Sequence, residues 1–105
     1  MVKASQPKSL FGLRLKEARL RAGIPQDKLG VSIGIDEGSA SARMSRYENG
    51  IHTPPFELVE LIAKTLKVPA PYFYCGDDRL AAIMLAYSSA SNTKREALLK
   101  FANSL

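Results

Sequence analysis

The sequence predicts an all-α protein. Helix start and stop signals follow one another along the 105 residues, whereas no alternating β-branched run bounded by turns is present. The hydrophobic fraction of 46% is ordinary for a globular chain, and a chain of this length can bury one modest core without disulfides or a metal. We therefore expect one domain with a short helical appendage.

The first two expected helices are separated by a glycine and a proline. Ser9 can cap a helix that runs to Ala22, and Gly23 is the left-handed residue that would end it. Pro25 suits the first turn of a second helix, because its missing N–H would be unpaired there anyway. This second helix is expected to end near Gly34.

The third expected helix lies within the segment GIDEGSASARMSRYENG. Ala40, Met44 and Tyr47 follow the spacing i, i+4, i+7, so they share one face and are predicted to be buried. The other face carries Arg43 and Arg46 among small residues. This composition raises the question of what the exposed face contacts.

A fourth helix and a short fifth turn are expected next. Thr53 would cap a helix that begins at Pro54-Pro55. Its predicted buried stripe comprises Phe56, Val59, Ile62, Ala63 and Leu66. Pro69 and Pro71 bracket a break before the segment PYFYC, whose aromatic residues are predicted to fill the core.

The C-terminal segment 77–105 is predicted to form a helical pair. Asp77 or Asp78 can cap its first helix, SSASN interrupts it, and Asn92 or Thr93 starts the last helix. The pair carries more apolar residues than are needed to cover a five-helix core. We therefore expect it to form or support a homodimer. They are Leu80, Ile83, Met84, Tyr87, Leu98, Leu99 and Phe101.

The charge is compatible with a polyanionic partner without requiring one. The formal net charge is +5 and the sequence pI about 9.6. Residues 1–30 carry seven basic and two acidic side chains, whereas residues 31–60 carry two basic and five acidic ones. The basic charge is thus unevenly distributed.

The residue types present in the chain argue against several functional classes. One histidine, no glycine-rich phosphate loop and no paired carboxylates around a cleft argue against an enzyme, a metal site or a cofactor. No ligand-binding domain accompanies the predicted helices, so a small-molecule ligand is not indicated. Cys75 has no partner for a disulfide and is predicted to be a small buried hydrophobe. No apolar run approaches a membrane span and no secretory leader is recognisable, so we expect a cytoplasmic protein.

Four segments in a fixed order resemble the Xre/Cro/cI-type helix-turn-helix family of phage and bacterial repressors. They are FGLRLKEARLRAGIPQDKL, MSRYENG, TPPFELVELIAKTLKV and PYFY. The positions that match the family motif are Gly23, Gln26, Glu48, Gly50 and Pro54. The resemblance implies a five-helix lambda-repressor-like domain over residues 9–76, with residues 77–105 as a C-terminal extension.

The resemblance also implies roles for individual residues. Arg19 would pair with Glu48 and tie the first helix to the end of the third. Bases of double-stranded DNA would be contacted by Ser41, Ala42, Arg43, Ser45 and Arg46. Phosphates would be contacted by Gln26, Asn49, His52 and Thr53. His52 is equally compatible with a plain surface position, and Thr53 is first of all a helix cap.

The chain departs from the family between the second and third helices. Twelve residues separate Ile35 from Glu48, about four more than in the family pattern, and about 3.6 residues make one helical turn. The extra residues either form a loop at DEGS, which would bring Asp36 and Glu37 close to phosphates, or add one turn to the start of the third helix. We favour the added turn, with Asp36 as its N-cap, because it keeps the faces of the helix in register.

The sequence therefore predicts a DNA-binding transcriptional regulator. We expect sequence-specific binding of double-stranded DNA, with a homodimer acting as a repressor on a palindromic operator. The alternative is a helix-turn-helix scaffold that serves as a protein-interaction module, of antitoxin-like or antirepressor-like type. The acidic insertion and the few side chains able to read bases motivate this alternative.

Overall fold

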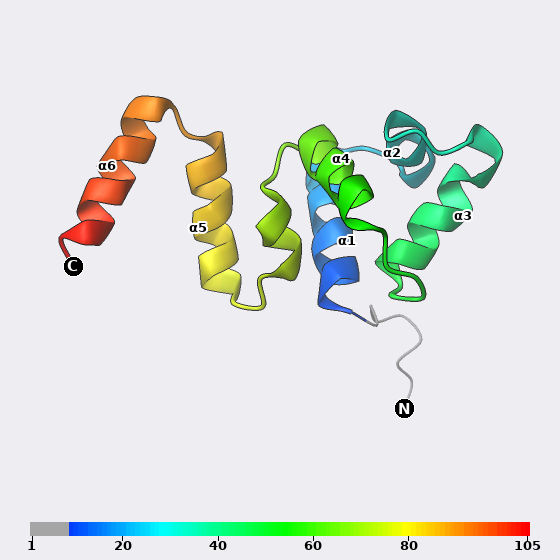
Figure 1. Cartoon of the computed structure of the whole chain (residues 1–105), viewed down its shortest axis with the longest axis horizontal. Helices are drawn as coiled ribbons and strands as arrows, with labels where there is room; N and C mark the ends of the chain where they lie inside the picture. The colour runs from blue at the N-terminus through cyan, green and yellow to red at the C-terminus, as the bar shows by residue number, and fades with distance from the viewer. Residues whose placement is uncertain (1–8) are drawn as a thin grey trace.

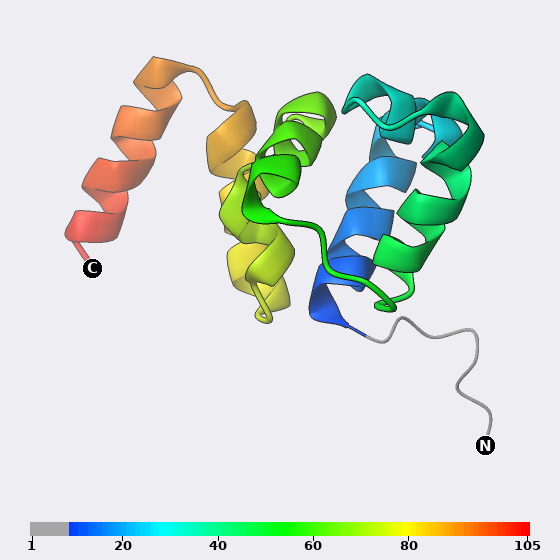
Figure 2. The same cartoon turned by 45° about the vertical axis from the view of Figure 1, so that its right-hand side comes forward.

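The computed structural model describes residues 9–105, and no strand occurs among them, so the all-α prediction is confirmed. The elements are α1 (Leu10–Ala22), α2 (Gln26–Ser32), α3 (Glu37–Glu48), α4 (Phe56–Leu66), the 3-10 helix η1 (Ala70–Tyr74), α5 (Asp78–Ser89) and α6 (Asn92–Asn103). Figures 1 and 2 show α2 and α3 at one end of the molecule and α6 at the other. None of these helices has the length and apolarity needed to cross a membrane.

The ends of α1 are fixed by the predicted caps. The Ser9 hydroxyl accepts a hydrogen bond from Gly12 N at 3.0 Å. Gly23 adopts the left-handed conformation with φ 71°, which most side chains disfavour, and so ends the helix. Pro25 differs from the prediction: it is the N-cap residue of α2, in extended conformation, rather than part of the first turn.

Helices α2 and α3 pack closely at Gly30. A Cβ atom at this position would lie 2.6 Å from Ala40 Cβ, so the absence of a side chain allows the two helices to approach. The connecting turn closes through Ile35 N, which donates to Gly30 O at 3.0 Å. The geometry of the helix-turn-helix therefore depends on a glycine in α2.

Helix α3 begins at Glu37, and the extra residues extend its N-terminus by a turn. Asp36 is the N-cap, and its carboxylate accepts from Gly38 N at 3.1 Å. The alternative of a loop at DEGS is wrong, because Asp36 is the N-cap and residues 37–39 belong to the helix. Ala40, Met44 and Tyr47 are buried, as their spacing predicts.

The start of α4 differs from the prediction in two respects. Thr53 is not the cap: Pro55 precedes the helix, because each proline holds the residue before it in an extended conformation. Phe56 is 61% exposed and does not belong to the buried stripe, since it is the first residue of the helix. The other four predicted stripe residues are buried.

The core lies between α1, α2, α3, α4 and η1. Its largest fully buried side chains are Tyr72, Phe73, Leu15, Leu29, Met44, Ile62 and Val59. Cys75 is buried as predicted. The third aromatic residue of PYFYC is an exception, because Tyr74 is 52% exposed.

An ion pair is buried between α1 and the end of α3. Arg19 and Glu48 are 9% and 3% exposed. Arg19 Nε donates to Glu48 Oε2, and Arg19 Nη2 donates to Glu48 Oε1 at 3.2 Å. Arg19 Nη1 also donates to Ile24 O at 3.0 Å, so the guanidinium additionally holds the turn that leads into α2.

A second buried arginine connects α1 with the start of α5. Arg14 Nε and Nη2 donate to Cys75 O at 3.0 and 2.8 Å, and Nη2 also donates to Asp78 at 2.9 Å. Burial by itself lowers the pKa of Arg14, but the hydrogen bonds to Asp78 and Glu17 outweigh it and the pKa is raised. The guanidinium therefore remains charged and keeps its bonds.

The two C-terminal helices differ in how they pack. Asp77 caps α5 by accepting from Arg79 N at 2.9 Å, and Ala81 of this helix joins the core. Helix α6, capped by Ser91, packs against α5 and buries none of its own residues. Helix α6 therefore extends away from the core.

The close approach at Gly30 predicts a large effect of a single methyl group. We expect Gly30→Ala to lower the free energy of unfolding by about 1–3 kcal/mol, because the methyl group overlaps Ala40. Gly38→Ala is the control: it lies in an exposed helical turn, and its methyl group would meet only the side-chain carboxylate of Asp36 at 3.2 Å, so we expect it to change stability by less than about 1 kcal/mol. Urea denaturation measures both, and equal stabilities would contradict the packing argument.

The buried ion pair predicts non-additive mutations. Arg19→Leu and Glu48→Leu should each destabilise the fold by about 3–5 kcal/mol, because each leaves an unpaired buried charge. The double variant should be more stable than the sum of the single effects implies, since it buries no charge. A double-mutant cycle by urea denaturation tests this, and additivity within about 0.5 kcal/mol would refute it.

Candidate nucleic-acid interface

The outer face of α3 carries the residues predicted to contact bases. Ser41, Ala42, Arg43 and Arg46 are exposed, and Ser45 is half-buried. They lie together because Ala40, Met44 and Tyr47 hold the opposite face against α1 and α2. Helix α3 lies at the end of the molecule opposite α6, so no other helix covers this face (Figure 1).

Arg46 has the freest cationic side chain of this face. It is exposed in the last turn of α3, and within residues 9–105 its guanidinium makes no hydrogen bond or ion pair. An arginine guanidinium presents several donors in a planar fork, which matches the two acceptors of a guanine edge. Arg46 can therefore contact a ligand without first losing an internal partner.

Arg43 is held by a neighbour on the same helix. Its Nη2 donates to Tyr47 Oη at 2.9 Å, and its guanidinium carbon lies 5.9 Å from the centre of the Tyr47 ring. Tyr47 thus combines a buried ring with a hydroxyl that positions Arg43. This contact was missed in the sequence, although the i, i+4 spacing could have indicated it.

Small side chains dominate the rest of the face. Ser41 and Ala42 are exposed but reach little beyond the backbone. Ser45 Oγ accepts from Asn49 Nδ2 at 3.2 Å. The face is therefore shallow, and it permits a close approach to a flat or grooved surface.

The residues predicted to contact phosphates lie in two places, at the start of α2 and after the end of α3. Gln26 opens α2, half-buried, and its Nε2 donates to Glu48 Oε1 at 3.1 Å. The same Glu48 pairs with Arg19, so the buried ion pair orients the Gln26 amide, which retains a second N–H. His52 and Thr53 are exposed in the segment between α3 and α4.

Asn49 is occupied within the protein. Its Nδ2 donates to Ser45 O at 2.9 Å as well as to Ser45 Oγ, and its backbone N–H also donates to Ser45 O. The side chain therefore completes the C-terminal end of α3. A phosphate contact by this amide requires that it give up at least one bond to Ser45.

The acidic residues of the insertion lie at the start of α3. Asp36 caps the helix and Glu37 is in its first turn, where a negative charge is favourable to the helix dipole. Both are separated from Arg46 by most of the helix. Residues 9–105 contain no group of three or more side chains suited to hold a metal ion.

Comparisons with known proteins agree with this architecture. The family model described as "Helix-turn-helix domain" matches residues 10–71. The crystal structure of the transcriptional regulator BswR is similar over 90% of this chain and 93% of that one, with a TM-score of 0.86 and 45% identity. No curated protein sequence matches the chain.

The family match spans more than half of the chain and includes both α2 and α3. The structural match extends the likeness to nearly the whole chain. Together they confirm the resemblance to the Xre/Cro/cI-type proteins. The chain belongs to the helix-turn-helix domain family.

Proposed function

We propose that the protein is a transcriptional regulator that binds double-stranded DNA sequence-specifically, as a homodimer on a palindromic operator, and represses transcription. One observation carries the proposal: α3 presents the unpaired guanidinium of Arg46 beside a shallow face of small residues. The major groove of B-DNA admits an α-helix, and arginine bidentate to guanine is the commonest specific contact there. BswR, a transcriptional regulator, is 45% identical.

Helix α3 would lie in the major groove. Arg46 would read a guanine, and Arg43 would reach a second base or phosphate while Tyr47 orients it. Ser41, Ala42 and Ser45 would lie close to the groove floor. Their small size favours contact with thymine methyl groups there and lets the helix follow the shape of the DNA. Few side chains can read bases, so specificity would depend strongly on the two arginines.

Phosphate contacts would position the helix. Gln26 would donate its second amide hydrogen to a phosphate near the start of α2, held there by Glu48. Asn49, His52 and Thr53 would contact phosphates beside the end of α3. The protein would act by binding, with no catalytic step and no cofactor.

Replacing Arg46 tests the base-reading role. Duplexes selected from a random DNA pool should share a palindromic site. Arg46→Ala should bind each half-site about 5- to 150-fold more weakly, which corresponds to about 1–3 kcal/mol for one guanine contact, so that a homodimer on the whole site loses the square of that factor. Arg79→Ala is the matched control, because Arg79 is exposed on α5, remote from α3. Equal losses for both variants, or no enriched site, would contradict the proposal.

The salt dependence of binding separates DNA recognition from a protein-interaction role. If several phosphates are contacted, the logarithm of the affinity for the selected site should fall steeply and linearly with the logarithm of salt concentration. Gln26→Ala should weaken binding similarly on all sequences, since its contact is to a phosphate. Fluorescence anisotropy measures both, and a flat salt response would favour the protein-interaction module.

A further inference from the structure

Two hydrogen bonds at the end of α3 connect two polar side chains of its outer face. Asn49 Nδ2 donates to Ser45 O at 2.9 Å and to Ser45 Oγ at 3.2 Å. The bond to the backbone carbonyl fixes which way the amide faces, because a carbonyl oxygen can only accept. The nitrogen of the Asn49 amide therefore faces Ser45, and Oδ1 lies on the other arm of the amide, without a hydrogen-bond partner among residues 9–105.

The hydroxyl of Ser45 differs from those of two other helical serines. Ser32 Oγ and Ser89 Oγ each donate to the carbonyl four residues earlier, at 2.8 and 3.0 Å. Ser45 Oγ instead accepts from Asn49, and within the described part of the chain its O–H donates to no acceptor. A hydroxyl has one donor hydrogen and two acceptor lone pairs, so the bond from Asn49 leaves the hydrogen of Ser45 free to bond a ligand.

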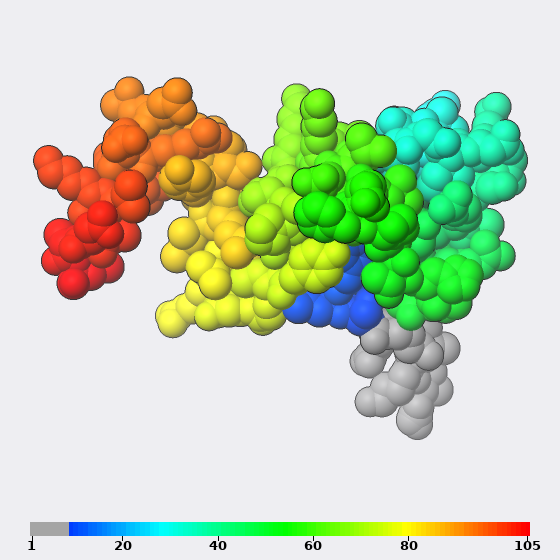
Figure 3. Space-filling model, in the orientation of Figure 1, coloured from blue at the N-terminus to red at the C-terminus, as the bar shows by residue number. Residues whose placement is uncertain are grey.

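The two residues lie beside the exposed guanidinium of Arg46. Ser45 directly precedes Arg46, and Asn49 follows it by three residues, a spacing that places two helical residues on the same side. Asn49 is exposed and Ser45 is half-buried. Figure 3 shows α3 at the surface, at the end of the molecule away from α6. A ligand that contacts Arg46 can therefore reach the polar atoms of both residues.

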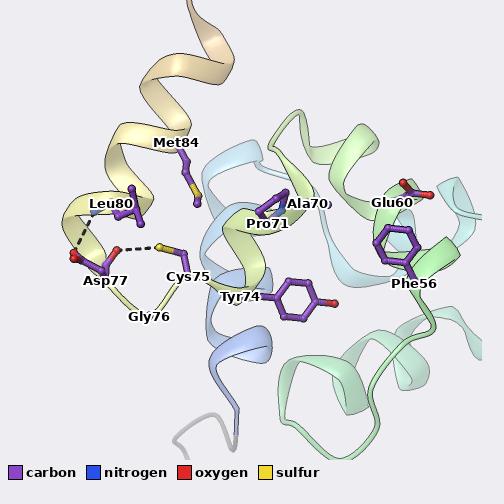
Figure 4. Close-up of a pocket in the computed structure, with 10 residues that line it drawn as sticks. All are labelled: Phe56, Glu60, Ala70, Pro71, Tyr74, Cys75, Gly76, Asp77, Leu80 and Met84. Carbon is purple, nitrogen blue, oxygen red and sulfur yellow. Dashed lines mark hydrogen bonds between the residues drawn. The ribbon is translucent and has the colours of Figure 1, made fainter. Parts of the chain in front are cut away.

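The apolar hollow of the molecule lies away from this face. It measures about 770 Å³ and lies over η1, with Phe56 of α4 on one side and Leu80 of α5 on the other (Figure 4). No residue of α3 lines it. A ligand in that hollow would not contact Ser45 or Asn49, so the two residues serve the partner that meets the outer face of α3.

The two free polar atoms have opposite hydrogen-bonding character. Ser45 Oγ offers a donor and Asn49 Oδ1 an acceptor, and they lie close together because Oγ is bonded to the Asn49 amide. In the major groove, adenine presents an acceptor at N7 beside a donor at its N6 amino group, whereas guanine presents two acceptors. Cytosine presents a donor alone, and thymine an acceptor beside a methyl group. Adenine is therefore the base whose edge complements these two atoms.

A phosphate complements the same two residues less well. Phosphate oxygens accept hydrogen bonds, so they are repelled by Asn49 Oδ1 and need the amide nitrogen instead. To supply that nitrogen, Asn49 must give up a bond to Ser45 that completes the C-terminal end of α3. Contact with an adenine edge leaves both bonds between Asn49 and Ser45 in place.

We infer that Ser45 and Asn49 act as one unit that reads an adenine next to the guanine contacted by Arg46. Ser45 Oγ donates to adenine N7, while Asn49 orients this hydroxyl and its Oδ1 accepts from the N6 amino group. The inference rests on the proposed function and refines it at Asn49, which contacts a base in place of a phosphate. Arg46 and the unit together then specify two adjacent base pairs of each half-site.

Selection of duplexes from a random pool by the full chain tests this assignment. The selected site should carry an A·T pair next to the guanine whose preference is lost in Arg46→Ala. Ser45→Ala should reduce the preference for this A·T pair over G·C about 2- to 10-fold per half-site, as expected for one hydrogen bond, and keep the guanine preference. Ser89→Ala is the matched control, because its hydroxyl bonds the backbone of α5, remote from α3. It should change neither preference.

Replacing Asn49 tests whether the two residues act as a unit. Without the amide, the Ser45 hydroxyl is free to turn to its own helix, as those of Ser32 and Ser89 do, so Asn49→Ala should lose at least as much A·T preference as Ser45→Ala. Adding Ser45→Ala to Asn49→Ala should then cost less than about 2-fold more, whereas independent contacts would multiply. Fluorescence anisotropy on the selected site and on its G·C variant measures these losses.

The salt dependence distinguishes a base contact of Asn49 from a phosphate contact. Asn49→Ala should leave the slope of log affinity against log salt unchanged, since no phosphate contact is removed. A similar loss on all sequences with a slope reduced by about one would place Asn49 on a phosphate and overturn the inference. Asn49→Ser replaces Asn49→Ala if circular dichroism shows loss of fold, because it keeps a donor for Ser45 O but lacks the amide.

The outcome of the selection separates this inference from the proposed function. A selected guanine that depends on Arg46, without an adjacent A·T pair, would overturn the inference and leave DNA recognition standing. Losses that multiply in the double variant would also overturn it alone. A protein that selects no site would contradict the proposed function and the inference together.

Discussion

The buried pair of Arg19 and Glu48 is the interaction on which the arrangement of α1, α2 and α3 depends. Glu48 receives hydrogen bonds from Arg19 of α1 and Gln26 of α2 while it ends α3. Arg19 also holds the backbone at Ile24. A buried pair adds little net stability, but it makes other arrangements costly, since a displaced helix would leave a charge without a partner. The position of α3 follows from this constraint.

The composition of α3 follows from two demands on one helix. Its inner face must pack against α2 closely, which Gly30 and Ala40 allow by contributing almost no side-chain volume. Its outer face leaves Arg46 unpaired and holds Arg43 on Tyr47. The extra turn is compatible with both demands, because it precedes Ala40 and leaves the spacing of the inner and outer residues of α3 unchanged.

The C-terminal half of the molecule is organised by arginine side chains and ends in unpartnered apolar surface. Arg14 joins α1 to Cys75 and Asp78, and Arg95 fixes the corner between α5 and α6. Both residues bond backbone carbonyls at the ends of elements, where such groups lack internal partners. The two corners carry the exposed face of α6 away from the core.

The sequence by itself determined which segments are helical, because caps and periodicity are local signals: Ser9, Gly23, Asp36 and Asp77 act at the ends where the sequence placed them. Motif order indicated the family and the pairing of Arg19 with Glu48. Tertiary structure decided the burial of Arg14, the exposure of Phe56 and Tyr74, and the stand-off of α6. These depend on which neighbours cover a residue, and neighbours distant in the chain leave no mark in local spacing.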